Sequence, residues 1–113
     1  MPIQEGDWTI NGNGFVGKLS LKSIDNTGRI GAGSNVYGGE IVGFWDEAAQ
    51  KLTFTRLEKG GNPQSAQFYV GYLMKDQAAP GTQRLAGTFE GFRLSGGTAA
   101  RSTFGWFAEQ PKR

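Results

Sequence analysis

The sequence predicts an all-β protein, an eight-stranded antiparallel up-and-down barrel in which residues 1–113 form a single domain. Three observations indicate this fold class. Apolar and polar residues alternate with a period close to two along most of the chain, which is typical of half-buried strands. Turn-forming residues interrupt the alternation at short intervals, so consecutive strands connect as in a meander. The length of 113 residues leaves no room for a second core.

The limits of the strands follow from the alternation and from the turns between them. The clearest turns are Asn-Gly-Asn-Gly at 11–14 and Asp-Asn-Thr-Gly at 25–28, since Asn-Gly is a strong hairpin signal. Residues 46–51 have a local helical tendency but are too few for a helix of their own. We expect strands at 7–10, 15–22, 29–33, 40–46, 51–57, 67–75, 84–92 and 101–109.

Five glycines lie at the centres of expected strands, flanked by large apolar residues. Glycine weakens a strand interior and usually marks a bend, a bulge or the close approach of another group. One interpretation is that these glycines let the strands coil tightly enough to close a small barrel, with large neighbours covering the gaps. The other is that they leave the waist of the barrel empty, as a ligand cavity lined by Trp45, Phe54, Tyr69 and Phe89. The five glycines are Gly17, Gly43, Gly71, Gly87 and Gly105.

The same glycines suggest which side chains point into the barrel. In strands 15–22 and 84–92 the central glycine shares the parity of the apolar face. Extending this rule places Ile41, Trp45, Tyr69, Leu73 and Phe107 inside. Parity also turns Arg56, Arg101 and Thr103 inward, and a rim arginine can anchor a carboxylate or a phosphate. The predicted ligand-binding residues are therefore Trp45, Phe54, Arg56, Tyr69, Phe89 and Thr103.

The composition excludes several kinds of chemistry. The chain has no Cys and no His, so thiolate metal sites, cysteine nucleophiles and histidine-based triads are not possible. We expect no cofactor and no metal. The net charge of +2 comes from interspersed signs without a basic run, which argues against a nucleic-acid partner. The sequence contains no signal-peptide pattern and no apolar run of membrane-spanning length, so we expect no membrane partner, and a cytoplasmic protein if Met1 is the native start.

Three expected strands are apolar on both faces, namely 40–46, 67–75 and 101–109. A strand that is apolar on both faces is normally covered on both, and a lone barrel of this length has nothing left to cover its outside. We therefore expect a homo-oligomer. The outer side chains expected at its contact are Phe44, Phe68, Tyr72, Phe104 and Trp106.

The first expected strand opens with Gly6-Asp7-Trp8, followed by Asn11 and Gly14. This opening resembles the Gly-x-Trp start of calycins, and it is similar to that of the avidin and streptavidin family. Residues 41–46 resemble a strand of the same family in pattern. The resemblance is one of fold, and it implies eight up-and-down strands and barrels that pair into tetramers. The middle and late strands carry Phe and Tyr where that family's biotin pocket has tryptophans.

The leading functional interpretation is a non-catalytic barrel that binds a small, partly apolar ligand. Two alternatives remain open. A barrel enzyme of the cyclase or isomerase type would act by positioning its substrate, assisted by Tyr69, Arg56 or Glu90. A carbohydrate-binding module would instead use exposed Trp106, Tyr72 and Tyr37 as stacking platforms. A barrel interior filled by side chains would argue against both an interior ligand and an interior substrate.

Overall fold

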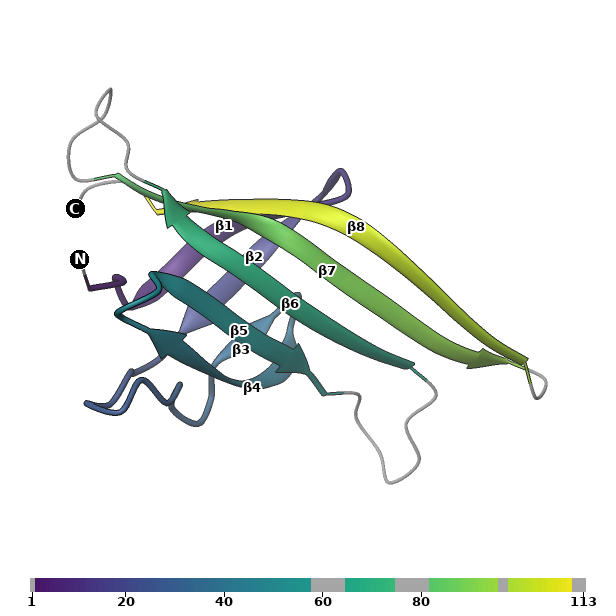
Figure 1. Ribbon diagram of the computed structural model, residues 1–113, viewed down its shortest axis with the longest axis horizontal. Helices are drawn as coiled ribbons and strands as arrows, with labels where there is room; N and C mark the ends of the chain where they lie inside the picture. Colours follow the sequence, from purple (N-terminus) through teal and green to yellow (C-terminus); the bar gives the residue numbers. More distant parts are fainter. Residues whose placement is uncertain (1, 58–64, 75–81, 96–97, 111–113) are drawn as a thin grey trace.

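Eight antiparallel strands close into a barrel, in which each strand pairs with the next in sequence and β8 returns to β1 (Figure 1). The computed structural model describes residues 2–57, 65–74, 82–95 and 98–110, and none of these lies in a helix, so no described helix could span a membrane. The predicted fold class is confirmed, and it is compatible with a calycin-like fold. The strands are β1 (Gly6–Gly12), β2 (Phe15–Leu21), β3 (Asn35–Val36), β4 (Gly39–Asp46), β5 (Lys51–Arg56), β6 (Ser65–Met74), β7 (Gln83–Ser95) and β8 (Thr98–Gln110).

The third strand is not where the sequence places it. Residues 29–33 make only single bridges, between Arg29 and Phe44 and between Ile30 and Ile24, and the strand β3 follows them with two residues. The reason is local turn chemistry, because Asp25 Oδ1 accepts hydrogen bonds from the backbone N–H groups of Thr27 and Arg29. The resulting loop still completes the barrel wall, since it exchanges three backbone hydrogen bonds of 2.7–3.1 Å with β4.

The interior consists of rows of side chains set by the strand register. Residues that pair directly across antiparallel strands lie on the same face of the sheet. One row joins Gly43, Phe54, Tyr69, Phe89 and Phe104 from β4 to β8, and these residues face inward. The neighbouring rows supply most of the remaining core. Its fully buried side chains include Trp8, Ile10, Leu19, Leu21, Leu52 and Leu85.

The facing of β8 is opposite to the prediction. Trp106 is 3% exposed and lies inside, whereas Phe107, expected inside, is 55% exposed. Arg101 and Thr103 also point outward and are exposed. The register explains the difference, because Trp106 pairs with Gly87, which in turn pairs with Gly71. A Cβ atom on Gly71 would overlap the Trp106 indole, so it is the absence of a side chain there that admits the largest ring of β8.

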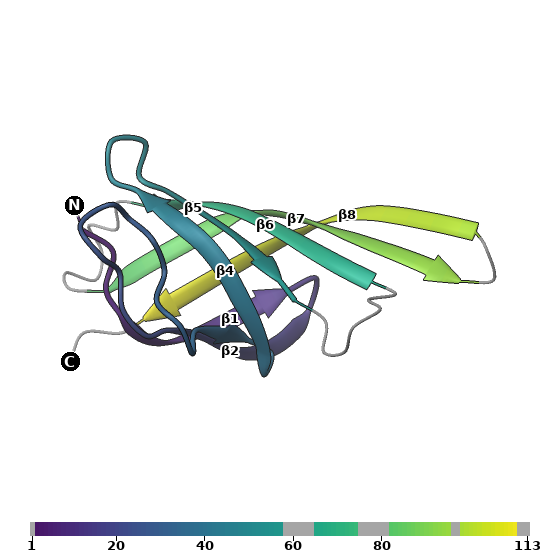
Figure 2. The ribbon, with the colours of Figure 1, turned by 90° about the horizontal axis from the view of Figure 1, so that it is seen from below.

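Strands β6, β7 and β8 extend past the rest of the barrel at one end, as Figure 2 shows. The pairs between β7 and β8 continue to Ser95 and Thr98, whereas β1 pairs with β8 only as far as Trp106. The inner face of this extension continues the row that contains Arg56 and Gln67 of β5 and β6. We call this side of the molecule the extended end.

The opposite end is closed by the segment before β1. Ile3 and Trp8 are buried there, at 7% and 1% exposed, and the Trp8 indole donates to the Gln4 carbonyl at 3.1 Å. Two buried glutamine amides hold the segment in place. Gln83 donates to the Pro2 carbonyl and accepts from the Gln4 N–H, and Gln110 donates to the carbonyls of Glu5 and Asp7. These bonds join residues that lie more than 75 positions apart in the chain.

Candidate functional site

Three of the predicted ligand-binding residues come together as a stack of rings inside the barrel. The rings of Phe54 and Tyr69 lie 4.6 Å apart with an angle of 13°, and those of Tyr69 and Phe89 lie 4.8 Å apart with an angle of 15°. The Trp106 indole meets this stack edge-on, at 6.0 Å from Phe54 and 5.9 Å from Tyr69. All four side chains are buried. At this level, side chains rather than an open cavity occupy the waist.

The space over four of the five strand-centre glycines, all except Gly105, is occupied as well. A Cβ atom on Gly17 would overlap the ring of Tyr37, and one on Gly87 would overlap the backbone of β6. The Tyr37 hydroxyl accepts from the Gly12 N–H at 2.9 Å and donates to the Phe15 carbonyl at 2.5 Å. These contacts agree with the interpretation in which glycines allow tight coiling and large neighbours cover the gaps.

The Tyr69 hydroxyl is the polar group of the stack, and it donates to Gln67 Oε1 at 2.8 Å. Burial, with a smaller effect of the neighbouring Tyr37, raises the pKa of Tyr69 to about 12. The phenol is therefore protonated at neutral pH and serves as a hydrogen-bond donor.

This pKa predicts a loss of stability in alkali. Tyrosine in an unfolded chain loses its proton near pH 10, whereas folded Tyr69 keeps its proton up to about pH 12. The free energy of unfolding should therefore be unaffected by Tyr69 below about pH 10, and fall above it by up to about 1.4 kcal/mol per pH unit. Urea unfolding at a series of pH values measures this slope. The Tyr69→Phe variant should lack this contribution, and an equal slope in both proteins would contradict the prediction.

Arg56 lies at the extended end, one row away from Tyr69. Its Nε donates to the Val36 carbonyl at 3.2 Å, and a Cβ atom on Gly39 would overlap its guanidinium group, so Gly39 leaves room for it. The side chain is half-buried. Arg56 pairs in register with Ile41 on one side and Gln67 on the other. The structure thus places Arg56 on the inner face of the barrel at the extended end, as the alternation along β5 predicts.

The other two predicted ligand-binding residues lie elsewhere. Trp45 is buried near the closed end, where its indole donates to Glu47 Oε1 at 2.9 Å. Thr103 faces outward and is exposed, because it pairs with Glu90 on the outer face of β7. Glu90 also accepts a hydrogen bond from Arg101 there. The three groups named for an interior enzyme are therefore not together, since Glu90 faces away from Tyr69 and Arg56.

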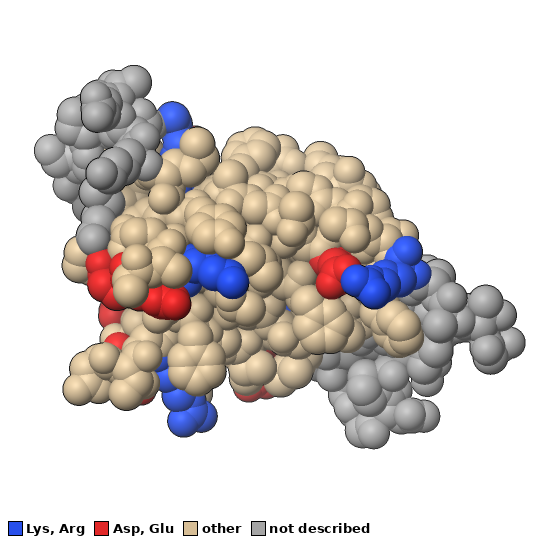
Figure 3. Space-filling model, viewed as in Figure 1, with Lys and Arg blue, Asp and Glu red and all other residues tan. Residues whose placement is uncertain are grey.

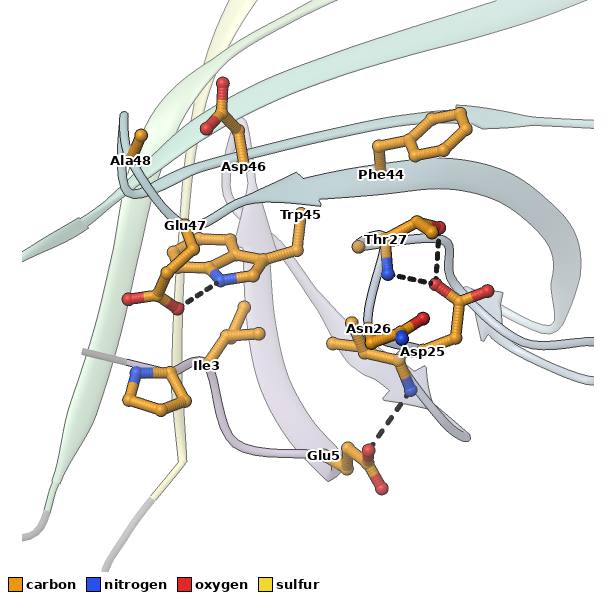
Figure 4. A pocket seen from close by; sticks show the side chains of 13 residues that line it. Ile3, Glu5, Asp25, Asn26, Thr27, Phe44, Trp45, Asp46, Glu47 and Ala48 are labelled. Carbon is orange, nitrogen blue, oxygen red and sulfur yellow. Dashed lines mark hydrogen bonds between the residues drawn. The ribbon is translucent and has the colours of Figure 1, made fainter.

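A cleft of about 750 Å³ lies beside Trp45 at the closed end (Figure 4). Its walls come from the segment before β1, the loop after β2 and the end of β4 with the turn that follows. The lining combines apolar side chains with carboxylates and contains no Lys or Arg among its described residues. The lining residues that matter for its chemistry are Ile3, Ile24, Phe44, Trp45, Glu5, Asp25, Asp46 and Glu47.

Hydrogen bonds of the carboxylates fix the walls of this cleft. Glu5 Oε1 accepts from the Ile24 N–H at 3.1 Å and thereby ties the segment before β1 to the loop. Asp25 Oδ1 accepts from the Thr27 hydroxyl at 2.6 Å and from the Thr27 N–H at 2.9 Å. The Thr27 hydroxyl, followed by the Thr27 N–H, holds the pKa of Asp25 below its ordinary value. Among the described residues, no three acidic side chains form a group suited to a metal ion.

The sequence did not indicate this cleft. Of its lining, only Trp45 was a predicted ligand-binding residue, and the others come from three separate segments. The turn signal at 25–28 was the one local clue that the loop would be ordered. The sequence also did not indicate that Gln67 would accept a hydrogen bond from Tyr69, or that Tyr37 would bond to the backbone of Gly12 and Phe15. No protein-family model matches the chain, and a search of curated proteins found no match either.

Proposed function

We propose that the protein is a non-catalytic barrel that binds a small, partly apolar molecule in the cleft at its closed end. The observation that carries this proposal is the cleft's size and lining. Its volume of about 750 Å³ falls within the range of about 300–1,000 Å³ that is usual for small-molecule sites. Apolar side chains with a few convergent polar groups are also what such sites contain.

The lining favours a ligand that carries a positive charge or several hydrogen-bond donors. Ile3, Ile24 and the Trp45 ring would contact its apolar part. Asp25 would attract a cation, and no described lining residue opposes it with a positive side chain. The packed aromatic stack makes the waist a less suitable place for a ligand. The avidin-like opening of the chain supports the fold but not a biotin-like ligand.

The tryptophan indole N–H groups provide the test, since Trp45 lines the cleft, Trp8 is buried at the same end outside the lining, and Trp106 lies edge-on to the aromatic stack. Titration of the ¹⁵N-labelled protein with phenethylamine should shift the indole resonance of Trp45 and leave that of Trp106 in place. The uncharged 2-phenylethanol should bind more weakly. Asn26→Trp, which adds bulk to an exposed lining residue, should prevent the shift. Equal effects on all three indoles, or none, would contradict a ligand site in this cleft.

We also propose that the barrels assemble as a homo-oligomer through the outer face of β4 and β6. Phe44, Phe68 and Tyr72 are 58%, 46% and 51% exposed on this face. Trp106 and Phe104, expected at the same contact, lie inside instead, and outward-facing Phe107 takes their place on β8. Figure 3 shows that the surface on this side of the molecule is largely uncharged and is interrupted by a few charged side chains. An exposed apolar surface of this kind is typical of a contact between subunits.

Paired substitutions in this face should separate the subunits. Phe68→Glu with Tyr72→Glu is expected to raise the dissociation constant of the oligomer by about 30-fold or more, because large aromatic side chains at the centre of an interface contribute most of its affinity. Sedimentation equilibrium measures the change. Phe15→Glu is the matched control, since Phe15 is 72% exposed but lies on β2, outside this face. A wild-type protein that is monomeric at high micromolar concentration would overturn the proposal.

A further inference from the structure

Arg56 and Gln67 form a pair of hydrogen-bond donors at the extended end, far in the fold from the closed-end cleft. They are direct neighbours in the register of β5 and β6, and both face inward. Arg56 Nε donates a hydrogen bond to the Val36 carbonyl. The two terminal nitrogens of Arg56 have no hydrogen-bond or ion-pair partner among the described residues. Gln67 uses its Oε1 to accept from Tyr69, and its side-chain nitrogen has no such partner there either.

The arrangement holds the guanidinium in place. The bond to Val36 and the space over Gly39 orient the planar group from one side. The Tyr69 hydroxyl orients the Gln67 amide by occupying its oxygen, so that its nitrogen remains to donate. An arginine whose orientation is already set loses less side-chain entropy when it binds a planar anion.

The described residues in the register rows around this pair are uncharged and partly apolar. The register row that contains Arg56 and Gln67 continues through Gly91 and Ser102 on the strands that extend past the barrel. The next register row towards the middle of the barrel is that of the aromatic stack. Its last member, Phe104, is half-buried, and its ring centre lies 5.2 Å from that of Phe89. No carboxylate occupies either row, so the positive charge of Arg56 is not neutralised within them.

We propose that Arg56 and Gln67 form a second binding site, which takes a molecule with a carboxylate or phosphate head and an apolar tail. The two terminal nitrogens of Arg56 bind two oxygens of the anion, which is the geometry that a guanidinium group favours. The Gln67 nitrogen donates to a remaining oxygen. The apolar tail lies against Phe104 and over the small residues Gly91 and Ser102. The site is independent of the closed-end cleft, because the two share no residue.

Octanoate, octyl phosphate and octanol are suitable probes, since they share a tail and differ in the head. Isothermal titration should show that octanoate or octyl phosphate binds the wild-type protein at least about ten-fold more tightly than octanol, given the strength of hydrogen bonds to a charged group. The tighter of the two anions identifies the preferred head. Arg56→Gln should remove this advantage, and Arg56→Lys should restore only part of it because lysine lacks the planar fork.

Arg29→Gln is the matched control, because it removes the same charge from an exposed side chain outside this site. Its affinity for both anions should equal that of the wild type. Thermal unfolding of each variant confirms that the barrel is intact. Equal binding of octanol and the anions, the absence of anion binding, or an unchanged affinity in Arg56→Gln would each overturn the proposal. None of these outcomes affects the phenethylamine titration, so the closed-end site stands or fails separately.

Discussion

Replacement of Trp106 by alanine is expected to lower the free energy of unfolding by about 3–5 kcal/mol, the usual cost of removing a large buried aromatic side chain. Trp106 is 3% exposed and lies edge-on to the rings of Phe54 and Tyr69. Its indole N–H donates to the carbonyls of Val70 and Thr88, at 3.2 Å and 3.1 Å. The substitution leaves a cavity over Gly71 and Gly87, which have no side chains of their own to fill it.

Urea unfolding followed by circular dichroism measures the loss, and Phe107→Ala is its control. Phe107 is the next residue of β8, but it faces outward and is 55% exposed. Its truncation should change the free energy of unfolding of a dilute, dissociated sample by less than about 1 kcal/mol. The opposite order of effects would mean that β8 presents its other face to the core.

Substitution of Gly87 by alanine is expected to destabilise the barrel by about 3 kcal/mol or more, beyond the usual cost of overpacking. An added Cβ atom would overlap the Val70 carbonyl oxygen and approach Gly71 Cα at 2.6 Å. These are backbone atoms of the paired strand β6, so no rotamer change can relieve the overlap. Strands β6 and β7 would have to separate where they now pair through Gly71 and Gly87.

Gly105→Ala distinguishes this close approach from a general cost of replacing glycine in a strand. Gly105 also lies at a strand centre, but a Cβ atom there would have its nearest neighbour at 3.9 Å. Its free energy of unfolding should change by less than about 1 kcal/mol. Thermal and urea unfolding of both variants provide the comparison. Similar losses at Gly87 and Gly105 would show that steric closeness to β6 is not the cause.

The strand limits were predictable wherever local signals decide them. Five expected strands begin and end within two residues of the observed β1, β2, β4, β5 and β6, because alternation and turn residues act over short distances. The expected strands 84–92 and 101–109 each miss three residues of β7 and β8 at one end. The prediction of the third strand was wrong because the Asp25 side chain accepts hydrogen bonds from the backbone N–H groups of Thr27 and Arg29, which favours a turn over a regular strand there. The strands β7 and β8 are also longer than expected, because a hairpin continues as long as its two strands stay in register.

The candidate sites were predictable only in part. The parity of β5 and β6 correctly placed Phe54, Arg56 and Tyr69 on the inner face, because alternation along those strands is regular. The rule of inward glycines failed on β8, where Gly105 faces outward and Trp106 lies over the glycines of two other strands. No local pattern in β8 contains that information. The closed-end cleft was missed for a similar reason, as its walls are joined by contacts such as that between Glu5 and Ile24.

The sequence by itself determined the class of fold, the number of strands and most of their limits, because period-two patterning and turn residues are properties of neighbouring positions. It also determined which chemistry is absent, since a chain without Cys or His cannot use either side chain. Tertiary structure decided which face of β8 is buried, that the waist is packed, and where the cleft and the Arg56–Gln67 pair lie. These features depend on register between strands distant in sequence, and a shift of one residue would turn every side chain to the other face.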